Sequence, residues 1–79
     1  MLATVRKRSE NPNGGSAEVT IYAEDEELAE LQKALAVVAR FKAQAMREAK
    51  VKLGKGDWVM TGFEVKPDRC RASLRWRNR

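Results

Sequence analysis

The sequence predicts an α+β fold of order β-β-α-β-β, in which a four-stranded antiparallel sheet carries one long helix on one face. Residues 2–9 and 16–23 alternate between apolar and polar side chains, which is the period of a half-buried strand. Residues 24–53 change to the 3.6-residue period of a helix, and residues 57–66 and 69–79 return to alternation. This order packs most simply as one sheet with the helix across one side, so we expect residues 1–79 to form a single domain.

The first two strands are expected to form a β-hairpin. Between them stands the cluster Asn11-Pro12-Asn13-Gly14-Gly15, whose Asn-Gly and Gly-Gly pairs tolerate the backbone angles of a tight turn. The residues expected to face the core are Ala3, Val5 and Lys7 in the first strand and Ala17, Val19, Ile21 and Ala23 in the second.

The predicted helix over 24–53 begins with four acids at 24–27, which suit the positive end of the helix dipole. It ends at Gly54, after the bases of its last turn. The apolar stripe that we expect to cover the sheet consists of Leu28, Leu31, Leu35, Val38, Ala45, Ala49 and Leu53, with Phe41 and Met46 at its margins.

The length of this helix predicts a homodimer. Thirty helical residues span ~45 Å, whereas an eight-residue strand covers ~26 Å. A second row of small residues, Ala29, Ala36, Ala39 and Ala43, would let another chain approach closely. The alternative reading of this row is that alanine is simply the best helix former.

The last strand separates two kinds of side chain. Cys70, Ala72, Leu74 and Trp76 point one way, and Arg69, Arg71, Ser73, Arg75, Arg77 and Arg79 point the other. One face of this strand is therefore expected to be core, and the other a row of guanidinium groups.

The third strand is assigned by the same alternation. Val59, Thr61, Phe63 and Val65 are expected in the core, which leaves Trp58 and Met60 on the open side of the sheet. The open side then gathers the candidate binding residues Arg6, Arg8, Tyr22, Trp58, Arg69, Arg71, Arg75 and Arg77.

Arginines interleaved with exposed aromatic rings favour nucleic acid, as single-stranded DNA or RNA or as structured RNA, because bases stack on rings and guanidinium groups meet phosphates. The net charge of +5 agrees with a polyanionic partner. An alternative is a protein-interaction module or inhibitor, of the kind that phages and mobile elements encode, which docks as a homodimer on an acidic or nucleoprotein partner. A third reading is that the arginines only keep the sheet soluble and pair with Glu18 and Glu64.

The composition argues against catalysis. The chain has no histidine, and its single cysteine, Cys70, has no neighbouring base and belongs to the apolar side of its strand. We therefore expect no enzyme activity, no cofactor and no metal. The lone cysteine and the absence of an apolar leader or membrane span predict a cytoplasmic protein that binds no membrane.

Overall fold

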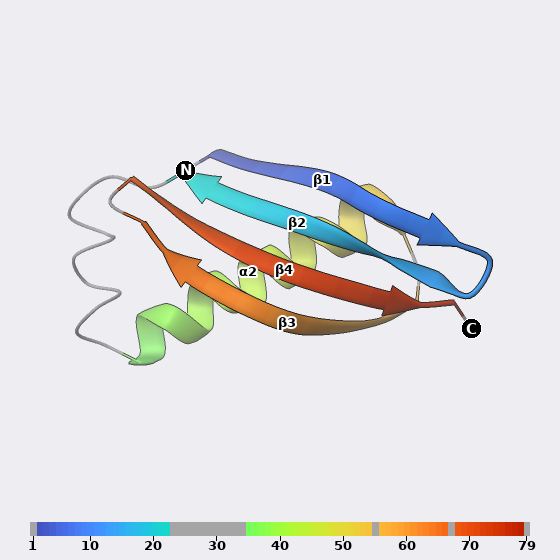
Figure 1. Ribbon diagram of the computed structural model, residues 1–79. Helices are drawn as coiled ribbons and strands as arrows, with labels where there is room; N and C mark the ends of the chain where they lie inside the picture. The colour runs from blue at the N-terminus through green and yellow to red at the C-terminus, as the bar shows by residue number, and fades with distance from the viewer. Residues whose placement is uncertain (1, 23–34, 55, 67, 79) are drawn as a thin grey trace.

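The chain folds into a four-stranded sheet with one helix across one of its faces (Figure 1). The computed structural model describes residues 2–22, 35–54, 56–66 and 68–78, with helix side chains from residue 38 onward. Its elements are β1 (Leu2–Asn11), β2 (Gly14–Tyr22), α2 (Leu35–Leu53), β3 (Asp57–Val65) and β4 (Arg69–Arg77). The order across the sheet is β1-β2-β4-β3, with every pair antiparallel. The predicted β-β-α-β-β fold is confirmed, and part of the predicted helix, residues 24–34, lies outside the described residues.

Strand β4 lies in the middle of the sheet, between β2 and β3. Its apolar residues Cys70, Ala72 and Leu74 are each 1% exposed, and they pack beneath the helix with Val19 and Ile21 of β2. The predicted alternation of the last strand is therefore confirmed. Burial raises the pKa of the Cys70 thiol, because desolvation disfavours the thiolate. This cysteine is a core residue.

The helix contributes Phe41, Ala45 and Ala49 to the core, at a spacing of four residues that keeps them on one side. All three side chains are 0% exposed. Phe41 was expected at the margin of the apolar stripe, and this expectation is wrong. Phe41 is the largest of the fully buried side chains, and it belongs to the same core cluster as the two alanines.

The helix ends as predicted at Gly54, whose φ of 95° belongs to the left-handed region that glycine tolerates. The Gly54 amide donates a hydrogen bond of 2.9 Å to the Lys50 carbonyl. The described helix of 19 residues spans ~28 Å, close to the ~30 Å of a nine-residue strand. The overhang that predicted a homodimer is thus not part of the described helix, and Ala39 and Ala43 are exposed.

The hairpin is held against the end of β4. Gly15 pairs with Trp76 in the β2–β4 register. A Cβ at Gly15 would lie 2.4 Å from two atoms of the Trp76 ring and 2.4 Å from the Ser9 carbonyl oxygen. Glycine is required here because the indole lies directly on the backbone of β2.

Gly15→Ala is expected to destabilise the protein by about 1–3 kcal/mol, the usual range for overpacking a filled site. Gly62→Ala is the matched control, since a Cβ there would lie an ordinary 3.7 Å from its nearest neighbour. Urea unfolding followed by tryptophan fluorescence measures both variants. Equal free energies of unfolding for the two variants would contradict the contact between Trp76 and Gly15.

Candidate functional site

Six arginines lie on the side of the sheet opposite α2: Arg6, Arg8, Arg69, Arg71, Arg75 and Arg77. We call this surface the arginine face. Strand pairing determines their neighbours: Arg6 pairs with Glu18, Thr20 with Arg71 and Tyr22 with Arg69. Arg8 stands at a register shift between Lys7 and Ser9, and its side chain still reaches Glu18. Tyr22 shares this face, so the structure brings together seven of the eight predicted residues.

The exception is Trp58, and its expected place on the open side is wrong. Trp58 packs against the core under the helix, with its ring centroid 5.1 Å from that of Trp76. Its indole Nε1 donates a hydrogen bond of 3.2 Å to the Gly54 carbonyl at the end of α2. Trp58 therefore connects the helix to the sheet. Met60, expected on the same open side, also packs on the core.

A β-bulge explains this error. The β3–β4 register shifts between Met60 and Gly62, so one residue, Thr61, has no partner in the pairing. Phe63 thereby returns to the same side as Trp58 and Met60. Val59, expected in the core, is 61% exposed beside Arg75 on the arginine face. Gly62 within an apolar strand was a signal of the bulge.

Glu18 neutralises the middle of the arginine face. Its Oε2 lies 3.2 Å from Arg8 Nη1, and its Oε1 lies 3.5 Å from Arg71 Nε. The Glu18 side chain is 19% exposed, which limits its screening by water. Arg71 Nε is buried and has no hydrogen-bond partner among the described residues. Arg8 and Arg71 are thus engaged by one carboxylate.

Asp68 neutralises one end of the row. Arg69 donates two hydrogen bonds to it, Nε to Oδ1 at 2.9 Å and Nη2 to Oδ2 at 3.0 Å. These contacts lower the pKa of the Asp68 carboxyl and raise the pKa of the Arg69 guanidinium. The Arg69 guanidinium carbon also lies 5.3 Å from the centroid of the Tyr22 ring. Arg69 is therefore ion-paired with Asp68, and its guanidinium group lies over the Tyr22 ring.

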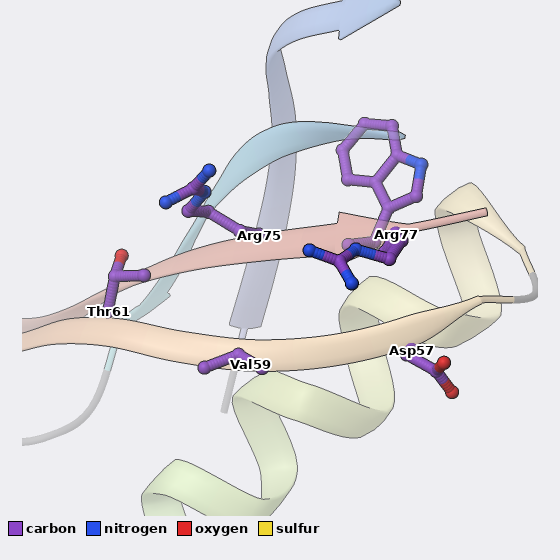
Figure 2. A pocket seen from close by; sticks show the side chains of 6 residues that line it. Asp57, Val59, Thr61, Arg75 and Arg77 are labelled. Carbon is purple, nitrogen blue, oxygen red and sulfur yellow. The ribbon is translucent and has the colours of Figure 1, made fainter. Parts of the chain in front are cut away.

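The remaining arginines of the arginine face are Arg6, Arg75 and Arg77. All three are exposed, and none forms an ion pair within the part of the chain that the structure describes. Arg75 and Arg77 are two residues apart on one strand, so their Cα atoms are ~7 Å apart. Both line a surface hollow shared with Asp57, Val59 and Thr61 of β3 (Figure 2). Both also line a second hollow beside the hairpin turn. Two of the three arginines therefore lie at the carboxyl end of β4, where Asp57 stands opposite Arg77 in the β3–β4 register.

Across residues 2–22, 35–54, 56–66 and 68–78, no group of three His, Cys, Asp or Glu side chains is arranged to hold an ion. Nor does this part of the chain include a helix that combines the length and apolar character needed to cross a membrane.

Comparison with protein-family models, with curated proteins and with solved structures finds no match for this chain.

Trp58→Ala is expected to lower the free energy of unfolding by about 2 kcal/mol or more, because it removes a core contact and a hydrogen bond to the helix end. Tyr22→Ala, on the opposite side of the sheet, should change it by less than about 1 kcal/mol. Urea unfolding by circular dichroism compares the two. A Trp58 variant as stable as the wild type would mean that this ring lies on the open side after all.

Proposed function

We propose that this chain is a small non-catalytic protein that binds nucleic acid by contacting its phosphate backbone with the arginine face. The observation that carries the proposal is the pair Arg75 and Arg77, which are exposed, stand two residues apart on the inner strand β4 and form no ion pair among the described residues. Guanidinium groups recognise phosphate oxygens through paired, charge-assisted hydrogen bonds. Arg6 adds a third available cation on β1.

The distribution of aromatic residues favours phosphate contacts over base contacts. The chain has two Trp, two Phe and one Tyr, and both Trp and both Phe pack in or against the core. Tyr22 remains on the arginine face, under Arg69. Stacking of unpaired bases needs exposed rings. We therefore expect duplexes and structured RNA to bind at least as well as single strands, with little sequence preference.

A second candidate is the protein-interaction module or inhibitor, docking as a homodimer on an acidic or nucleoprotein partner. Exposed Val59 favours it, because Val59 stands beside Arg75 on edge strand β3. Apolar and arginine side chains together are typical of protein interfaces. We place either activity in the cytoplasm, because a single cysteine in the core suits a reducing compartment.

The double variant Arg75→Gln with Arg77→Gln is expected to weaken nucleic-acid binding at least about tenfold, since each lost charged hydrogen bond is worth roughly 1.5 kcal/mol or more. Lys7→Gln with Lys66→Gln is the matched control: it removes two surface bases outside the arginine face, which Glu10 and Glu64 already engage. It should change the Kd by less than about threefold. Fluorescence anisotropy with a labelled 20-base-pair duplex and the corresponding single strand, in low salt, measures both.

Glu18→Gln is expected to strengthen nucleic-acid binding in the same assay. Without the carboxylate, Arg8 and Arg71 become available to phosphates, so the affinity for nucleic acid should rise.

Polyglutamate as a competitor tests the second candidate, which predicts that polyglutamate displaces bound nucleic acid as effectively as unlabelled nucleic acid does. The proposal fails if the Arg75/Arg77 variant binds like the wild type. It fails also if no oligonucleotide binds the wild type below about 10 μM, tighter than the weak end of non-specific binding.

A further inference from the structure

Helix α2 has a basic side that takes no part in the function proposed for the arginine face. Arg40, Arg47 and Lys50 are all exposed, and we call these three residues the helix ridge. Successive helical residues turn by ~100°, so Arg40 and Arg47 lie within ~20° of each other and Lys50 within ~80° of Arg40. Arg47 lies ~160° around the helix from Ala45, which is in the core. The ridge therefore faces away from the sheet.

The ridge carries charge of one sign, because its three residues are all basic. Elsewhere on α2, Lys42 and Lys52 lie ~160° and ~120° around the helix from Arg40, and the one acid of α2, Glu48, lies ~80° from it. None of these five bases forms an ion pair among the described residues. Arg47 and Lys50 are three residues apart and therefore neighbours on the helix surface, where like charges repel, so an external anion bound there would be stabilising.

Two of these bases also contact rings of the core. Lys42 Nζ lies 5.5 Å from the centroid of the Phe63 ring, and Arg40 Cζ lies 5.5 Å from that of Phe41. The charged end of Lys42 is thus drawn toward β3. Between Arg40 and Arg47 stands exposed Ala43, which is too small to obstruct a surface lying along the ridge.

We propose that the helix ridge is a second nucleic-acid-binding surface, so that one domain bridges two nucleic-acid segments. This rests on the proposed function for one segment, which lies on the arginine face. The other segment lies on the opposite side of the molecule, along α2, as the arrangement of helix and sheet in Figure 1 allows. From Arg40 to Lys50 the ridge extends ~15 Å. That length corresponds to about four phosphates of one strand at ~3.4 Å each.

The test measures bridging and simple binding separately. Bridging is the capture of a fluorescent 20-base-pair duplex by a second, bead-bound duplex in the presence of protein, with DNA and RNA duplexes in separate arms. Simple binding is anisotropy with one duplex. The helix variant carries Arg40→Gln, Arg47→Gln and Lys50→Gln. Its matched control carries Lys7→Gln and Lys66→Gln, which remove surface bases already paired with Glu10 and Glu64.

We expect the helix variant to lose at least about tenfold in bridging while its Kd for one duplex changes less than about threefold, and the control to behave like the wild type. Circular dichroism establishes that each variant is folded. Unchanged bridging by the helix variant overturns the inference, since a homodimer joining two arginine faces would then explain the capture. The inference is also overturned if the wild-type protein binds one duplex and captures no second duplex. That result leaves the proposed function unaffected.

The two proposals fail in different ways. If the helix variant loses all binding to one duplex while the Arg75/Arg77 variant keeps it, the ridge is a binding surface and the function proposed for the arginine face is wrong. If polyglutamate abolishes bridging as effectively as nucleic acid of equal charge while one duplex stays bound, the ridge recognises acidic protein, and the inference is again overturned.

Discussion

Apolar and arginine side chains alternate along β4, which places the apolar set beneath the helix and the arginines on the opposite side of the sheet. Because β4 lies between β2 and β3, its apolar residues form the middle of the core and its arginines the middle of the open face. A shift of pairing by one residue would exchange the two sets, placing Arg75 where Leu74 lies. Burying a guanidinium group without a partner costs several kcal/mol. The core and the arginine face therefore determine each other's position.

Ion pairing then decides which arginines are available. Glu18 lies on β2 within reach of both neighbouring strands, and it engages Arg8 and Arg71. Asp68 engages Arg69 from the turn before β4. Arg75 and Arg77 follow on the same strand, and among the described residues neither forms an ion pair with these acids. A uniform row of arginines in the sequence thus becomes an asymmetric surface, with its accessible charge at the carboxyl end of β4 and on Arg6.

The sequence predicted those parts of the fold that depend on local periodicity. The two faces of β4, the hairpin and the end of the helix at Gly54 are all confirmed. The faces of β3 were assigned wrongly because apolar residues stand on both sides of its bulge, so strict alternation placed Trp58 opposite to where it packs. The availability of individual arginines depends on the pairing of β4 with β2, which brings Glu18 to Arg71. No pattern within one strand contains that information.

The proposed function requires β4 to separate the core from a phosphate-binding surface. Nuclear magnetic resonance tests this requirement by following the arginine Nε–H and tryptophan indole signals of ¹⁵N-labelled protein as a duplex is added. On the sheet, we expect the largest shifts at Arg75, Arg77 and Arg6, smaller ones at Arg69, and an unmoved indole signal from Trp58. If a saturating duplex shifts the Trp58 indole signal and leaves Arg75 and Arg77 unmoved, the proposed function is wrong.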